Sequence, residues 1–323
     1  MSELPNIEAP KCNDASRNPA KRRDIVRAQL ISTRSFAIAM LLLLTVDQGL
    51  LNCAQDPAWK VNPRISANQL VREVIHNQLQ AQIDDQTLWR YRDLKEKGGR
   101  SELRQVIETK DGELDRLLDV NREPLTAAQD QMEDGRIQKL LAHPDEIRKE
   151  QRTRREDNQK EDQLLQSFPR AFIFQYDGVD GNLIGLGFTP NPHFHASNRQ
   201  ELVFHHMEGT MWIDGSQKRL AGMDGHLTSR VKFGGGLLGH LNQGGTFSMR
   251  LKDVGSGHWS LDSLDIQITG KALFFKTIGL QQKERCTDYS PIPENMTLRR
   301  AAQLLREESR ASLQPVKPRP TRN

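Results

Sequence analysis

The sequence has few cysteines, few aromatic residues and no long hydrophobic run. Three cysteines in 323 residues are too few for a disulfide framework, and their spacing matches no metal motif. The longest apolar run, residues 36–46, is too short to span a bilayer, which needs about 20 residues. Aromatics make up only 6% of the chain and the net charge is +4, with the two signs interspersed. Because no basic stripe carries interleaved aromatics, we expect no nucleic-acid partner.

Common catalytic motifs are also missing, since the chain contains no GxSxG, HExxH, CxxC or P-loop pattern. Residues 234–239 contain GxGxxG, but an antiparallel strand follows rather than the helix that a dinucleotide site requires. A local set of Asp253, Ser256 and His258 shows no sign of an oxyanion hole. We therefore predict a non-enzymatic protein without a cofactor, and we assign the glycines to a sharp bend of a curved sheet.

The N-terminus carries the composition of an export signal. Basic residues precede the apolar run 36–46, and cleavage after Ala54 would leave a mature chain. Two alternatives stay open. Cys53 follows Leu-Leu-Asn and is a lipidation candidate, or residues 36–54 remain as an anchor in the inner membrane. We expect an exported protein of the periplasm or outer envelope that associates with membranes only through its N-terminus.

Alternation of apolar and polar residues dominates the second half of the chain. Phe247, Met249 and Leu251 alternate with polar residues, and residues 264–269 repeat the pattern. A period of two places one face of a sheet in the core and the other in water. Short glycine-marked turns permit only antiparallel neighbours. We therefore predict an antiparallel meander over residues 201–289, with earlier strands at 87–97, 171–176 and 183–188 and a type I′ hairpin at Asp111-Gly112.

Helical periodicity indicates amphipathic helices at residues 67–83 and 126–141, followed by a densely charged helix over 145–163 and a short terminal helix at 297–308. The predicted fold is α+β: a curved antiparallel sheet, or half-barrel, covered by helices. We divide the chain into a signal peptide or membrane anchor (1–54), a linker (55–65), a single α+β domain (66–309) and a disordered tail (310–323). Within the domain, residues 126–167 form a charged helical insertion.

Four histidines lie close together in the sequence, at positions 193, 195, 205 and 206. His193, His195 and His205 are weak candidates for a metal site, because a loop could fold over a strand that carries His205. The more ordinary interpretation is that they are exposed loop and strand histidines, so we predict no metal.

The apolar residues of the predicted strands allow two interpretations. They fill a core covered by the helices at residues 67–83 and 126–141, or they line a cavity for an acyl chain, which gains about 0.8 kcal/mol per buried methylene. The cavity candidates are Phe172, Phe174, Phe204, Met211, Ile213, Phe233, Phe247, Trp259 and Phe274.

Three segments resemble a known superfamily. They are residues 207–214 (Met-Glu-Gly-Thr-Met-Trp-Ile-Asp), Lys218-Arg219-Leu220, and residues 271–278 (Lys-Ala-Leu-Phe-Phe-Lys-Thr-Ile). They look like the hairpin and closing strands of the bacterial outer-membrane lipoprotein carriers and receptors of the Lol system, and of the related sigma-factor regulator domains. This resemblance implies an unclosed barrel with a helical lid over an apolar cavity. The charged segment 145–163 departs from the family pattern.

Our leading hypothesis is an exported member of this superfamily that binds an acyl chain, lipid or lipoprotein without catalysis. The first alternative is an envelope signalling or scaffold module that binds a protein partner. The second is a histidine-metal hydrolase.

Overall fold

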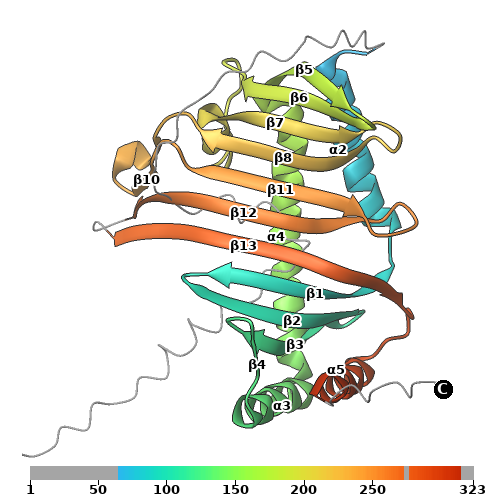
Figure 1. The fold of residues 1–323 in the computed structure, drawn as a ribbon. Helices are drawn as coiled ribbons and strands as arrows, with labels where there is room; N and C mark the ends of the chain where they lie inside the picture. The colour runs from blue at the N-terminus through green and yellow to red at the C-terminus, as the bar shows by residue number, and fades with distance from the viewer. Residues whose placement is uncertain (1–64, 273–275, 314–323) are drawn as a thin grey trace, which may run out of the picture. The chain divides into compact units, whose positions relative to one another are not determined.

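The computed structural model of the protein describes residues 65–272 and 276–313, all of which belong to the unit Thr33–Asn323. The predictions for residues 1–54, for Cys53 and for Phe274 lie outside the described residues. The architecture is α+β, as predicted. One large antiparallel sheet is open rather than closed into a barrel, and helices pack against it (Figure 1).

The sheet has 13 strands, and its main path runs β4-β3-β2-β1-β13-β12-β11-β8-β7-β6-β5. Most strands pair with a neighbour in the chain, but β8 pairs with β11, β10 pairs with β12, and the first strand, β1, pairs with the last strand, β13. The strands are β1 Leu88–Lys97, β2 Arg100–Thr109, β3 Gly112–Val120, β4 Glu123–Pro124, β5 Phe172–Asp180, β6 Leu183–Pro190, β7 Met207–Asp214, β8 Arg219–Leu227, β9 Val231–Phe233, β10 Gly239–Leu241, β11 Thr246–Asp253, β12 Trp259–Ala272 and β13 Lys276–Ile292.

The described helices are α2 (Ala67–Asp84), α3 (Ala127–Ala142), α4 (Pro144–Ala171) and α5 (Leu298–Leu313). The hydroxyl of Ser66 caps α2, and Thr126 forms a capping box with Gln129 at the start of α3. Pro144 ends α3 and opens α4, because its fixed φ suits the first turn of a helix. α5 continues past residue 309 into the segment predicted as a tail.

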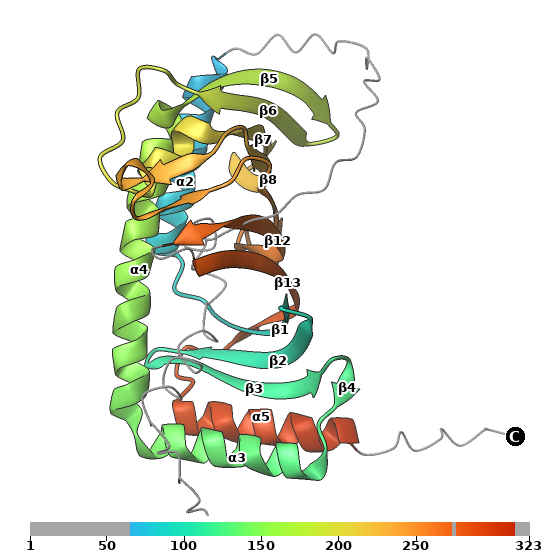
Figure 2. The ribbon, with the colours of Figure 1, turned by 90° about the vertical axis from the view of Figure 1, so that its left-hand side faces the viewer.

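Helices α2 and α4 lie on the concave side of the sheet, whereas α3 and α5 lie beyond β3 at one end of it (Figure 2). We predicted that the segment now seen as α3 would cover the core beside α2. That prediction is wrong, because the charged helix α4 takes this place and spans the sheet from β3 to β5.

Two local predictions are also wrong. Residues 201–206 form a 3-10 helix rather than a strand, so the meander begins at Met207. The β2–β3 turn lies at Lys110-Asp111, where neither φ is positive, and therefore is not type I′. The type I′ signature of two consecutive positive φ angles occurs instead at Gly98-Gly99 and Asn121-Arg122.

The concave face of the sheet has an apolar half and a polar half. From β6 to β12 it buries side chains such as Leu186, Met211 and Ile266 in the main core, to which α2 also contributes. On β1 to β3 and β13 it buries four acids instead: Asp93, Glu108, Asp115 and Glu284. The prediction of an apolar inner face is therefore wrong for this half. Several of its buried strand positions hold charged residues that face α4.

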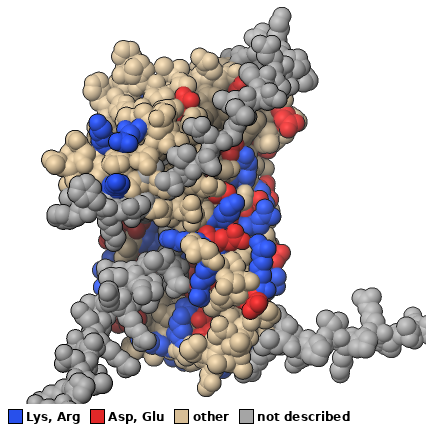
Figure 3. Space-filling model, turned by 60° about the vertical axis from the view of Figure 1, so that its left-hand side comes forward, with Lys and Arg blue, Asp and Glu red and all other residues tan. Residues whose placement is uncertain are grey.

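Charged side chains of both signs gather over the lower part of the surface shown in Figure 3, and the upper part is largely uncharged. Ion pairs link strand β3 to helices α3 and α4. Arg154 of α4 pairs with Glu113 of β3, and Arg136 of α3 lies 3.2 Å from Asp115. Arg116 is almost fully buried and lies 2.6 Å from both Asp130 and Asp134 of α3. Glu113, Asp115 and Arg116 of β3 thus all have partners of opposite sign on the helices.

Candidate binding cleft

A cleft of about 900 Å³ opens between α2, α4 and the concave face of the sheet. It lies at the boundary between the apolar and polar halves, because its floor includes β1, β2, β8, β12 and β13. This volume is at the upper end of the 300–1,000 Å³ usual for small-molecule sites.

Apolar side chains from both helices and the sheet line one part of the cleft. Several are only half-buried, so they present carbon surface to its interior, and Ile83 at its edge is 68% exposed. Such surface gains free energy when a ligand covers it. The residues concerned are Leu79, Ile83, Leu164, Leu165, Leu251, Val254 and Trp259.

Aromatic rings gather at another part of the cleft. The rings of Trp89 and His258 lie 4.7 Å apart, and Tyr289 lies 6.2 Å from Trp89. A bulge in β13, with Asp288 at a φ of 56°, shifts the register here, and the Tyr289 hydroxyl donates to the Leu261 carbonyl at 2.9 Å. The indole Nε1 of Trp89 is buried and makes no hydrogen bond among the described residues.

Acidic residues outnumber basic ones around the cleft. Its lining carries five carboxylates, and Arg219 is its only permanently cationic side chain among the described residues. Asp85 pairs with the Nδ1 of His258, and Glu108 accepts a hydrogen bond from the backbone N–H of Trp89 at 3.0 Å. Burial raises the pKa of Asp162 and lowers the pKa of Arg219, since both lose hydration. The five acids are Asp84, Asp85, Glu108, Glu161 and Asp162.

The predicted cavity residues separate into two groups. Phe204 and Trp259 line the cleft. Phe172, Phe174, Met211, Ile213 and Phe247 are buried in the main core, and Phe233 packs against that core while half-buried. Phe172 and Phe174 form an aromatic cluster with three further phenylalanines, Phe168, Phe188 and Phe204. The ring centroids lie 4.6–6.3 Å apart, and the cluster fills the space beneath α4.

The candidate metal histidines do not form a ligand group. His193 and His195 lie in an exposed loop, where the His195 ring contacts the backbone carbonyl of His193 at 3.1 Å. His205 lies on the 3-10 helix and packs against Phe194. Within residues 65–272 and 276–313, the group that brings three metal-type ligands together is Asp93, Glu284 and Cys286.

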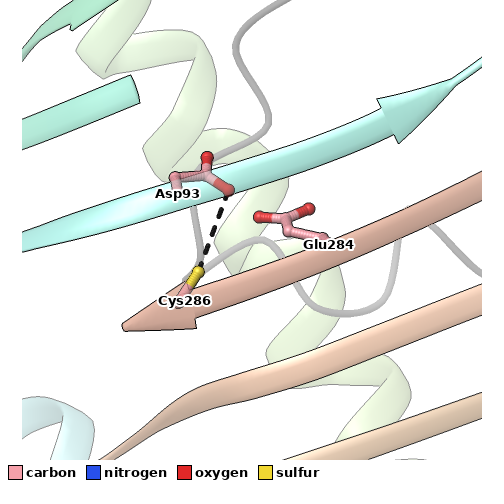
Figure 4. Close-up of side chains that lie close together, drawn as sticks. All are labelled: Asp93, Glu284 and Cys286. Carbon is pink, nitrogen blue, oxygen red and sulfur yellow. Dashed lines mark hydrogen bonds between the residues drawn. The ribbon is translucent and has the colours of Figure 1, made fainter. Parts of the chain in front are cut away.

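That group lies on the paired strands β1 and β13, with its side chains directed toward one another (Figure 4). The Nζ of Lys95 lies 2.6 Å from Asp93 and 3.3 Å from Glu284, so an ammonium already occupies the position between these carboxylates. Burial raises the pKa of the Cys286 thiol well above its ordinary value. A protonated thiol is a poor metal ligand. We therefore interpret the group as a buried ion-paired cluster.

Most residues of the cleft were not predicted from the sequence. His258 was a candidate only beside Asp253 and Ser256, and Asp253 instead accepts a hydrogen bond from Gln217. Asp85, Trp89 and Tyr289 were not predicted as site residues. One available signal was the pair Asp84-Asp85 at the end of a predicted helix, where the helix dipole disfavours acids. The glycines 234–236 link the short strands β9 and β10 with positive φ angles, consistent with a bend.

Comparison with known proteins adds little. No family model matches the sequence, and no curated protein matches it. A crystal structure of a DUF1329 family protein from Desulfovibrio piger shares 10% identity, with 68% of this chain and 92% of that chain covered and a TM-score of 0.22. A likeness at that level carries no argument, so the Lol-type resemblance stays a prediction. No described helix is both long and apolar enough to cross a membrane.

Proposed function

We propose that this protein is an exported, non-catalytic envelope protein that binds an amphiphilic ligand, with an acyl chain, in the cleft between α2, α4 and the sheet. The observation that carries the proposal is the set of half-buried leucines around a 900 Å³ space. In a filled core these side chains would contact one another and exclude water. Their remaining surface can instead be covered by a chain, at about 0.8 kcal/mol per methylene.

The mixed lining of the cleft supports a ligand with two ends. An acyl chain would contact the leucines of α4 and β11, and a polar group would meet the acids and rings near β1. A purely apolar ligand would leave the buried carboxylate Glu108 facing hydrocarbon, which is costly.

The substitution Ile83→Gln tests the proposal. Ile83 lines the cleft, and it is as exposed as Met132 on α3, at 68% each, so Met132→Gln is a matched control. We expect Ile83→Gln to weaken binding of dodecyl maltoside about fivefold, through a loss of about 1 kcal/mol of apolar contact. Titration calorimetry below the micelle concentration measures the affinity.

Met132→Gln should bind as the unsubstituted protein does. Equal weakening by the two substitutions, or no binding of any twelve-carbon amphiphile, would contradict the proposal. The second outcome would favour the envelope scaffold that binds a protein partner.

The proposed location rests on the apolar run 36–46 and its basic flank. Fractionation of the host cell, with mass measurement of the purified protein, tests it. We expect a periplasmic or envelope species that begins after Ala54, or one that carries a lipid on Cys53. A full-length cytoplasmic protein would contradict it.

A further inference from the structure

Acidic side chains line the cleft all the way from its edge to its floor. Asp84 is exposed, Asp85 and Asp162 are half-buried, and Glu108 and Glu161 are buried, each 6% exposed. They come from three different elements: α2, β2 and α4. Arg219 does not pair with any of them, because it bonds to the side chain of Gln78 and the carbonyl of Gly257.

Two of these acids are placed against local preference. Asp84 ends α2 and Asp85 is its C-cap, while no basic residue lies in the last turn of the helix. The C-terminal end of a helix carries partial negative charge, so acids there are unfavourable. A conflict between local preference and structure is expected at a functional site. The carbonyl end of α2 therefore adds to the negative potential at the edge of the cleft.

Trp89 supplies a second, independent observation. Its side chain lines the cleft and is 4% exposed, and its Nε1 donor has no hydrogen-bond acceptor among the described residues. Buried donors are nearly always bonded. An acceptor oxygen on a bound ligand would satisfy this one. The faces of aromatic rings also attract cations, and Trp89, Trp259 and Tyr289 all line the same space.

We propose that the ligand is a cationic amphiphile: an acyl chain joined through an ester or amide to an ammonium group. The carboxylates and rings hold the ammonium, Trp89 Nε1 donates to the ester or amide oxygen, and the leucines cover the chain. This inference rests on the proposed function and names the ligand class for the same cleft.

Three twelve-carbon probes that differ in the charge of the polar group test the inference: dodecanoylcholine, dodecyl maltoside and dodecanoate. Calorimetry at low salt should show dodecanoylcholine binding about tenfold more tightly than dodecyl maltoside, and dodecanoate binding most weakly. Equal affinities, or tightest binding of dodecanoate, would overturn the cationic assignment and leave the amphiphile-binding proposal intact. If none of the three binds, both proposals fail.

A double substitution links the preference to the cleft. Asp84→Asn with Asp162→Asn should abolish most of the preference for dodecanoylcholine and leave dodecyl maltoside affinity within about twofold. Asp177→Asn with Asp180→Asn on β5 is the control, because it changes the net charge equally at exposed sites outside the cleft lining. A preference retained in the first variant, or lost equally in both, would overturn the inference. Thermal unfolding confirms that both variants are folded.

Discussion

At the scale of single residues, Lys95 allows two carboxylates to lie buried side by side. Its ammonium lies 2.6 Å from Asp93 and 3.3 Å from Glu284, and both acids are almost fully buried. One cation cannot neutralise two anions in a poorly hydrated core. Burial, followed by repulsion from Asp93, therefore raises the pKa of Glu284 to about 7.

This raised pKa makes stability depend on pH. The folded protein holds the Glu284 proton up to about pH 7, whereas the unfolded chain loses it near the ordinary value of 4.5. The contribution to stability is complete below pH 4.5 and is lost as the pH rises toward 7. From pH 5 to 7.5 we expect this group to lower the free energy of unfolding by roughly 2 kcal/mol. Urea unfolding of the wild type and of Glu284→Gln at both pH values measures it.

The difference in stability between Glu284→Gln and the wild type should change over this range, because glutamine does not titrate. Glu294→Gln, at an exposed carboxylate, should follow the wild type. Parallel profiles for the wild type and Glu284→Gln would show that Glu284 is already ionised at pH 5.

At the scale of elements, β7 and β8 approach too closely for a side chain at Gly209. A Cβ at this position would lie 1.9 Å from the Asp224 carbonyl oxygen and 2.6 Å from the Cα of Gly225, both on β8. The two glycines face each other in the strand register. Backbone atoms of a central strand pair cannot move apart without breaking ladder hydrogen bonds.

We therefore expect Gly209→Ala to lower the free energy of unfolding by about 3 kcal/mol, as overpacking does in a tight interior. Gly187→Ala on β6 is the matched control, since a Cβ there meets no atom within 4 Å. Gly187→Ala should change the free energy of unfolding by less than about 1 kcal/mol, because alanine has less conformational freedom than glycine in the unfolded chain. Chemical denaturation compares the two variants, and similar losses would show that the strands can adjust.

The elements themselves were largely predictable from the sequence. Alternation located β11 and β12, and helical spacing with the caps Ser66 and Thr126 located α2 and α3. The 3-10 helix at residues 201–206 was missed, because a short segment with Val203 and Phe204 buried looks like a strand. Charge density correctly predicted that α4 is a helix, but it concealed that Ile147 and Glu161 within the charged segment are buried.

At the scale of the whole described structure, the open sheet has two edges that could pair with other chains. One edge ends in the two-residue strand β4, beyond which α3 and α5 pack, and the other is β5. Short strands and covering helices are common ways to block edge pairing. The opposite face of the sheet near β3 belongs to a second core, where Ile107 and Leu114 contact α5. The cleft beneath α2 and α4 lies on the concave face, away from this second core.

The amino-acid sequence by itself determined the α+β class, the antiparallel pairing and the burial of one strand face, because periodicity and turn length act over a few residues. Tertiary structure decided that β1 pairs with β13, and that a charged helix crosses the concave face. It also brought Asp85 and Trp89 to His258 and Tyr289, more than 160 residues further along the chain. A local pattern specifies which face of a strand is buried but not which distant strand lies beside it, so the cleft could be found only in three dimensions.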